Sequence, residues 1–511
     1  MSRQPNGAES GSDTANSLSQ EKPQLIKEED GTYPTEEERK VPLKFKILAL
    51  LCAIFFSAGS HFATNALNSL KTALKTELAI DNTQYGAAQA ALYLMNTLIP
   101  VMGGLMIDHF GTIKGSFVSS TLVLGGNILL LISAYVRSYG LLVAGRVMHG
   151  FGSSIIIVAQ QTILGRWFRG SALATALGIQ TASTNLFAYI AQVSMVPLKD
   201  SGWWGNGFWL SVSICFVSWL TVLIYGFVLY RSGGEQIGNR PKRPLSLRDI
   251  VHLPAAFWWI PLIIFFFGGS TSPFLGSVIE FVGKRYGMKE QVASVNGSVS
   301  LIVPIVLSPL MGGFLDRFGH RTTMVIFASF LLILNYALLG YSWAHPVAPL
   351  VLFSIANAVG PVAYNSAVAL ILHPDLVGTG CGLVRAAFSV SVSMVHLLTG
   401  NLQDAYGGSY DGVMIMFLIL SILTTLVAIG FALYDRAYYF GMLNASVARR
   451  LRIIDTKRDQ LPNTSSAKSK VPLRSYIICG IFLIFVLVAW AWFIWSLVEN
   501  PTKTFARYKF N

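Results

Sequence analysis

The stretch Gly104-Leu105-Met106-Ile107-Asp108-His109-Phe110-Gly111 returns, with changes, as Gly312-Gly313-Phe314-Leu315-Asp316-Arg317-Phe318-Gly319. The two copies are 208 residues apart, and each lies between two long apolar runs. Glycines allow helices to approach and the chain to turn, and charged groups at helix ends are satisfied by helix dipoles and water. A polar hairpin repeated at a half-chain interval is typical of a transporter with two parallel structural repeats.

The composition is that of a membrane protein. Of 511 residues, 53% are hydrophobic and 12% are charged, and the mean hydropathy is +0.54. Because a spanning helix needs about 20 mostly apolar residues, we expect twelve spans between residues 45 and 434 and a thirteenth from Ile477 to Val498. The predicted fold is an all-α polytopic membrane protein of two six-helix repeats plus an extra carboxyl-terminal helix.

The same apolar runs divide the chain into segments. We expect a disordered tail (1–42), an amino-terminal bundle (43–230), a central loop (231–255), a carboxyl-terminal bundle (256–434), a basic linker (435–474), an extra helix (475–498) and a final tail (499–511). The central loop and the linker are rich in arginine and lysine, whereas the loops at the other side are poorer. The positive-inside rule therefore places the amino terminus, central loop and linker in the cytosol, and the final tail on the luminal or exterior side.

The amino-terminal tail contains Glu21-Lys22-Pro23-Gln24-Leu25-Ile26. An acid, three spacers and two aliphatics form an acidic dileucine pattern, of which Glu21, Leu25 and Ile26 are the defining residues. Exposed aliphatics in a disordered tail are costly unless a partner buries them, which favours a sorting adaptor as that partner. The alternative is a chance match to a short pattern.

Catalytic and cofactor motifs give no convincing match. We find no metal-ligand spacing, P-loop, nucleophile elbow or dinucleotide fingerprint, so we expect no enzyme activity, no cofactor and no metal. The excess of lysine and arginine over acidic residues is explained by membrane topology. The sequence shows no nucleic-acid-binding module beside it. The expected partners are the bilayer and a small solute. Without a nucleotide site, any pumping must draw on a gradient.

The repeated hairpins resemble the signature loops of the major facilitator superfamily. The residues that carry this resemblance are Gly104, Asp108 and Gly111 in the first loop and Gly312, Asp316, Arg317, Gly319 and Arg321 in the second. Gly145-Arg146-x3-Gly150-x-Gly152 also resembles a superfamily motif. The resemblance implies a six-plus-six helix fold whose two loops take part in conformational change. In the first loop His109 replaces the usual cation.

A narrower resemblance covers most of residues 45–434. The stretches Val158-Ala159-Gln160-Gln161, Gly165-Arg166-Trp167-Phe168-Arg169-Gly170, Pro273-Phe274-Leu275-Gly276 and Ser308-Pro309-Leu310-Met311-Gly312 look like the lysosomal dipeptide-transporter branch. This implies a vacuolar or lysosomal membrane carrier with a glycosylated accessory subunit. The chain departs from that branch at Ser153 and Asn185, where animal members carry an acid and an arginine.

Ionisable residues inside the predicted spans are the main candidates for solute binding. Arg146, in the fourth helix, binds a solute carboxylate bidentately, tunes a proton site, or is a structural arginine bonded to carbonyls. Arg385, in the eleventh helix, is either a second anion anchor or a side chain that snorkels to the interface. Glu280, near the outer end of the seventh helix, is either a proton carrier or one half of an i,i+4 pair with Lys284.

Uncharged polar residues on the presumed cavity helices form a second tier. Each of them either contacts solute or joins helices by hydrogen bonds. This tier comprises Gln160, Asn185, Tyr364 and Asn365, together with His61, Asn65, Gln161, Gln180 and Asn357.

The sequence thus predicts a secondary-active or facilitative transporter of a small polar organic solute across a vacuolar or lysosomal membrane, working by alternating access. Dipeptides, amino acids and organic anions are the candidate solutes. The alternatives are a plasma-membrane carrier and a transporter-like sensor or scaffold that does not transport.

Overall fold

The computed structural model describes residues 43–110, 112–168, 171–231, 253–372, 374–457 and 473–499. The sorting motif and most of the central loop fall outside these ranges, so the predictions for them stay predictions. The described residues are helical, with no strand among them. Nine of their helices are long and apolar enough to cross a membrane, or ten with the bent pair described below.

Two bundles follow one another along the chain, and each has its own hydrophobic core. The first contains α2 (Leu43–Ser69), α3 (Lys71–Glu77), α4 (Asn82–Phe110), α5 (Thr112–Val136), α6 (Tyr139–Trp167), α7 (Ser171–Asp200) and α8 (Asn206–Arg231). The second contains α10 (Trp259–Leu275), α11 (Val278–Tyr286), α12 (Glu290–Phe318), α13 (Arg321–Tyr341), α14 (Val347–Ile371), α15 (Pro374–Ala405) and α16 (Asp411–Tyr438). Two further helices follow, α17 (Val447–Lys457) and α18 (Leu473–Glu499).

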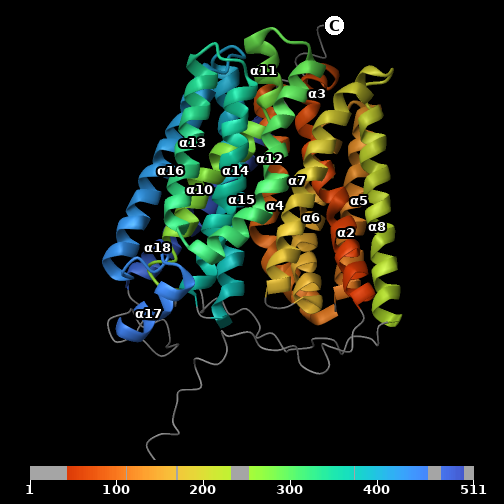
Figure 1. Cartoon of the computed structure of the whole chain (residues 1–511). Coiled ribbons are helices and arrows are strands. Elements are labelled where there is room, and N and C mark those ends of the chain that lie inside the picture. Colours follow the sequence, from red (N-terminus) through yellow and green to blue (C-terminus); the bar gives the residue numbers. More distant parts are fainter. Residues whose placement is uncertain are drawn as a thin grey trace, which may run out of the picture.

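The bundles meet along two helix pairs, α4 with α15 and α7 with α12. We call the surface between the bundles the seam. Figure 1 shows the bundles side by side, with α3 and α11 at one end of the molecule and α17 at the other. We refer to these as the α3–α11 end and the α17 end.

The seventh expected span, 256–282, is not one straight helix. It consists of α10 and α11, which are bent by 61° at the break around Gly276. At the break Ser277 has φ of −126°, outside the helical range, and its N–H donates to the carbonyl of Phe274, only three residues earlier. The bend carries α11, and Glu280 with it, to the α3–α11 end of the molecule.

Two short helices lie in segments that the sequence analysis treated as loop or linker. α3 follows α2 and carries Lys71 and Lys75. α17 lies within the linker and has its arginines among aliphatic residues. Neither helix is long enough to give a strong periodic signal in the sequence.

Helix α18 contains the expected thirteenth apolar run and packs against both α4 and α15. The side chains of Val486, Ala489 and Phe493, spaced three and four residues apart, are buried, whereas those between them are largely exposed. The ring of Phe485 lies 5.3 Å from that of Phe265 in α10. The helix therefore covers one edge of the seam and touches both bundles there.

The first residues of the linker dock onto the start of α13. The Asn444 side-chain oxygen accepts hydrogen bonds from the backbone N–H groups of Thr322 (3.1 Å) and Thr323 (3.4 Å). The Asn444 carbonyl also accepts from the His320 N–H at 3.2 Å. These donors are at the amino-terminal end of α13, where a helix lacks internal partners. Asn444 therefore caps α13 from a distant part of the chain.

Replacement of Asn444 by alanine should destabilise the carboxyl-terminal bundle by about 1 kcal/mol, the usual cost of losing a helix cap. Thermal unfolding of the purified protein in detergent measures this. Ser446→Ala is the matched control, because it removes the sequon Asn444-Ala445-Ser446 but keeps the Asn444 amide. Equal unfolding temperatures for Asn444→Ala and the wild type would contradict the capping role.

Candidate functional site

Arg146 is buried in α6, facing α4. Its Nη2 donates to Oε1 of Gln89, and its Nε donates to the carbonyl of Ala88 at 3.4 Å. Its Nη1 is buried with no partner among the described residues. Because a guanidinium has five N–H donors in a planar fork, Arg146 still has donors to offer after binding α4.

The glycines around Arg146 allow this close contact between helices. A Cβ on Gly150 would lie 2.8 Å from the Leu92 carbonyl of α4, and one on Gly152 would lie 2.5 Å from the Ser119 carbonyl of α5. Any side chain at these positions would push the helices apart. The motif therefore seats α6 deep between α4 and α5.

Arg385 lies on α15, the helix that faces α4 from the other bundle. Its guanidinium is 5.3 Å from the ring centre of Phe388, and its Nε is buried without a partner among the described residues. Tyr364, from α14, is buried and lies within electrostatic range of Arg385. The edge of its ring packs against Phe267, 5.8 Å away.

The other second-tier residues have varied surroundings. Gln160 is buried and bonds the Ala53 carbonyl (3.0 Å) and the Ser57 hydroxyl (2.8 Å) of α2, so it joins helices within the first bundle. Asn185 is half-buried and donates to the carbonyl of Thr181 in its own helix at 2.9 Å. No hydrogen bond to its side-chain oxygen is found among the described residues. Asn365 is exposed on α14.

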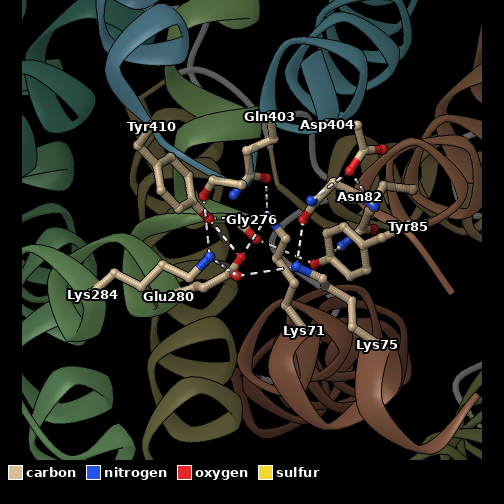
Figure 2. Close-up of polar contacts among 12 residues, drawn as sticks. Lys71, Lys75, Asn82, Tyr85, Gly276, Glu280, Lys284, Gln403, Asp404 and Tyr410 are labelled. Carbon is tan, nitrogen blue, oxygen red and sulfur yellow. Dashed lines mark hydrogen bonds and ion pairs between the residues drawn. The ribbon is translucent and has the colours of Figure 1, made fainter. Parts of the chain in front are cut away.

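Glu280 is the centre of a cluster of charges that joins the two bundles (Figure 2). Its carboxylate lies 2.8 Å from Nζ of Lys71 and 3.3 Å from Nζ of Lys75, both on α3 of the first bundle. Lys284 of its own helix is 3.0 Å away, and Tyr410 donates a hydrogen bond at 2.7 Å. We call these five residues the latch cluster. The pair with Lys284 is the i,i+4 contact predicted from the sequence.

Lys71 is the most buried cation of the latch cluster. It donates to Oε1 of Gln403 at 2.7 Å and to the hydroxyl of Tyr410 at 3.0 Å. Burial lowers the pKa of Lys71 to about 8, and the carboxylate of Glu280 opposes this shift. Burial also raises the pKa of Tyr410 well above its usual value, so this hydroxyl stays protonated and donates.

A second contact between the bundles lies beside the latch cluster. The carboxylate of Asp404, at the end of α15, accepts hydrogen bonds from the side chain of Asn82 (2.7 Å) and the backbone N–H of Thr83 (2.7 Å). Asn82 is the first residue of α4, so the acid of one bundle caps a helix of the other and faces the positive end of its dipole. Lys75 donates to the Asn82 side-chain oxygen at 2.6 Å, which connects this cap to the latch cluster.

The contact between α4 and α15 continues along the seam from this end. A Cβ on Gly86 would lie 2.4 Å from the carbonyl of His396, and one on Gly400 would lie 2.4 Å from the carbonyl of Asn82. Further in, Tyr93 of α4 shares a 3.0 Å hydrogen bond with Ser272 of α10. The two backbones are therefore in direct contact, and the seam is closed at the α3–α11 end.

The second signature loop is compact. Gly319 has φ of +79° and His320 has φ of +61°, and Arg321 is buried with its Nε 3.1 Å from the Ser366 hydroxyl. Arg317 is exposed over the Phe318 ring. At Gly312 a Cβ would meet no atom of the described residues within 4 Å, so no close helix approach is found there in that part of the chain. Gly319 is the crowded glycine, with a Cβ position 2.4 Å from the Ala445 carbonyl.

For the first loop the structure describes less. Gly104 and Asp108 lie in the last turns of α4, in a part whose side chains are not described. Gly111 falls outside the described residues, as the side chain of Asp316 does in the second loop. The charge contacts expected of Asp108 and Asp316 therefore stay predictions.

Sequence reasoning missed Lys71, Gln403, Asp404 and Tyr410 as members of this contact. The sequence gave one indication that these residues could meet, because the positive-inside rule places Glu280, Lys71 and Lys75 on the same side of the membrane. No pattern in the sequence indicates which of the loops on that side meet. Gln89, the partner of Arg146, was also missed, since a glutamine in an apolar helix gives no distinctive signal.

Similar proteins support the architecture. A sequence profile of the Major Facilitator Superfamily matches residues 50–289. The lysosomal dipeptide transporter MFSD1 of Danio rerio is 24% identical over 423 residues, covering 80% of this chain and 91% of that protein. Its Homo sapiens counterpart is 23% identical over 426 residues, covering 80% and 90%. Among solved structures, the nucleoside transporter NupG matches with a TM-score of 0.60 at 15% identity, covering 76% of this chain and 98% of that one.

These likenesses agree with the predicted family and fold. The relatives and the solved structure are transporters rather than enzymes. At an identity of 15%, the solved structure supports the arrangement of the helices and nothing about the solute.

Proposed function

We propose that this chain is a multi-pass membrane transporter of the major facilitator superfamily, and that it carries a small polar organic solute across a vacuolar or lysosomal membrane by alternating access. The observation that carries this proposal is the seam, with Arg146 buried beside it and the latch cluster closing one end. Opening that end requires Lys71 and Lys75 to leave Glu280. An alternating-access carrier needs such a contact, one that breaks and re-forms between bundles.

Dipeptides, amino acids and organic anions are the solutes we propose, the first because the relatives named above are dipeptide transporters. Arg146 and Arg385 are proposed to bind the solute, with Asn185, Tyr364 and Asn365 as further contacts. A plasma-membrane carrier is the alternative location, and a non-transporting sensor is the alternative function. A glycosylated accessory subunit is proposed only because the resemblance of the motifs to the lysosomal dipeptide-transporter branch implies one.

Solute flux into proteoliposomes that contain the full chain tests this function. We expect saturable uptake of at least one of the three solute classes, with and without an imposed pH gradient. A folded, reconstituted protein that moves none of them would contradict transport and favour the sensor.

The proposed location depends on the dileucine pattern at Leu25 and Ile26. Replacing both residues with alanine should move the protein from the vacuole or lysosome to the cell surface, because a sorting adaptor would lose its aliphatic contact. Fluorescence microscopy with a surface-labelling assay measures this. Leu18→Ala is the control, since it removes an aliphatic of the same tail outside the motif. Unchanged localisation of the double variant would remove this support for the compartment.

A further inference from the structure

Two arginines from opposite bundles lie beside the seam without a matching acid. Arg146 has a buried Nη1 and Arg385 a buried Nε with no partner among the described residues. Neither arginine forms an ion pair with any residue that the structure describes. Arg146 is fully buried and Arg385 is half-buried. Burial of a guanidinium whose charge is uncompensated costs several kcal/mol by general estimates, so such groups are normally paired.

The two cations belong to one region of the molecule. Arg146 bonds Ala88 and Gln89 of α4, and Tyr93 lies one helical turn further along. Tyr93 is within electrostatic range of both arginines. The edge of its ring packs on Phe388, 6.3 Å away, and Phe388 is the ring beneath Arg385. The region therefore has an arginine with an unpaired N–H group on each side of the packed rings of Tyr93 and Phe388.

The acids of the seam helices are elsewhere. Among side chains that the structure describes, the acids on or beside the seam helices are Asp200, Glu280, Glu290 and Asp404, and all are at the α3–α11 end. Glu280 and Glu290 pair with lysines, and Asp404 caps α4. Among the described side chains, no carboxylate lies in the middle of any helix that lines or neighbours the seam. These helices are α2, α4, α6, α7, α10, α12, α14 and α15. Nothing in this region can therefore bind an ammonium group by charge.

We propose that the solute is a small organic carboxylate with a net negative charge, held between Arg146 and Arg385. This inference rests on the proposed function and narrows its solute class. Guanidinium binds carboxylate through two parallel hydrogen bonds, which suits donors left open on two helices. Because the arginines belong to opposite bundles, a bound anion also offsets their mutual repulsion and draws the seam together. A zwitterionic dipeptide brings an ammonium group that this region repels.

Uptake of four labelled probes into proteoliposomes of the full chain tests the inference. The probes are succinate (dianion), lactate (monoanion), glycylglycine (zwitterion) and lysylalanine (cation). We expect kcat/KM for at least one of the two anions to exceed that for either peptide by tenfold or more. Peptide uptake equal to or faster than anion uptake would overturn the inference and leave the transporter function intact. Uptake of no probe by folded protein would overturn both.

Variants of Arg385 separate charge from folding. Arg385→Gln should raise the KM for the preferred anion by tenfold or more, and Arg385→Lys should restore part of it because the charge returns. Arg231→Gln, which removes an exposed cation at the end of α8, is the matched control and should transport as the wild type does. The same anion should raise the unfolding temperature of the wild type and not that of Arg385→Gln. Equal protection of both proteins would contradict the site.

Discussion

Replacing Arg146 with lysine should lower the affinity for the transported solute by about ten- to a hundredfold. Lysine keeps the charge but has one nitrogen in place of the arginine fork, so it cannot bind Gln89 and a solute in the same geometry. Loss of a desolvated, charge-assisted hydrogen bond costs about 1.5–3 kcal/mol, which corresponds to that change in affinity. The KM of proteoliposome uptake measures it.

The structural interpretation of Arg146 makes a different prediction, and Gln89→Met distinguishes the two. This variant removes the bond from Arg146 to Gln89, together with the bonds from Gln89 to Asn68 and Tyr85. It leaves the cation and its bond to the Ala88 carbonyl in place. If Arg146 binds solute, Gln89→Met should lower the unfolding temperature with little change in KM, whereas Arg146→Lys should raise KM with little change in unfolding temperature. The opposite pattern, in which both variants melt early and transport with normal affinity, would show that Arg146 only joins helices.

Much of this architecture could be predicted from the sequence because a bilayer restricts the chain so strongly. Long apolar runs mark the spans, and the repeated hairpin marks the two halves. The packing around Arg146 was also predictable, since Gly150 and Gly152 are the residues that allow helices to touch. These features depend on local composition, which a single sequence shows directly.

The contacts between the halves could not be predicted in the same way. Glu280 pairs with Lys71 and Lys75, more than 200 residues earlier in the chain, and the meeting depends on the bend between α10 and α11. The sequence offered Lys284 as a partner because it is four residues away on one helix. It gave no way to choose among the lysines of the other loops. Ion pairs between residues far apart in the sequence can be identified only when the packing of the two bundles along the seam is known.

The latch cluster has more positive than negative charge, with three lysines facing one carboxylate. Every ion pair in it therefore depends on Glu280, although Lys71 also binds Gln403 and Tyr410 of the second bundle. Once that end opens, Lys71 and Lys75 remain on the first bundle as cations facing the solution. In the closed state Asp404 and Asn82 contribute a second contact that does not involve Glu280.

Replacement of Glu280 by glutamine should open the α3–α11 end of the seam. Removing one partner of a buried ion pair costs about 3–5 kcal/mol, and a tenfold change in an equilibrium corresponds to about 1.4 kcal/mol, so the closed state should lose more than a hundredfold in relative population. A cysteine at Thr399, a buried residue of α15 near Gln403, reports this opening in a background without other cysteines. We expect a membrane-impermeant maleimide to label it much faster in Glu280→Gln.

Two further variants show whether the ion pair is responsible for that opening. Glu77→Gln is the matched control, because Glu77 pairs at 3.0 Å with Arg137 inside the first bundle, and labelling at Thr399 should not change. Lys71→Met added to Glu280→Gln should cost less than the two changes summed, since no unpaired buried charge of that pair remains. A proton carrier at position 280 would behave differently: Glu280→Gln would lose pH-driven accumulation, keep counterflow exchange and leave labelling unchanged. That result would contradict the latch, because loss of the ion pairs of Glu280 should raise the accessibility of Thr399 even though Asp404 and Glu290 still join the bundles.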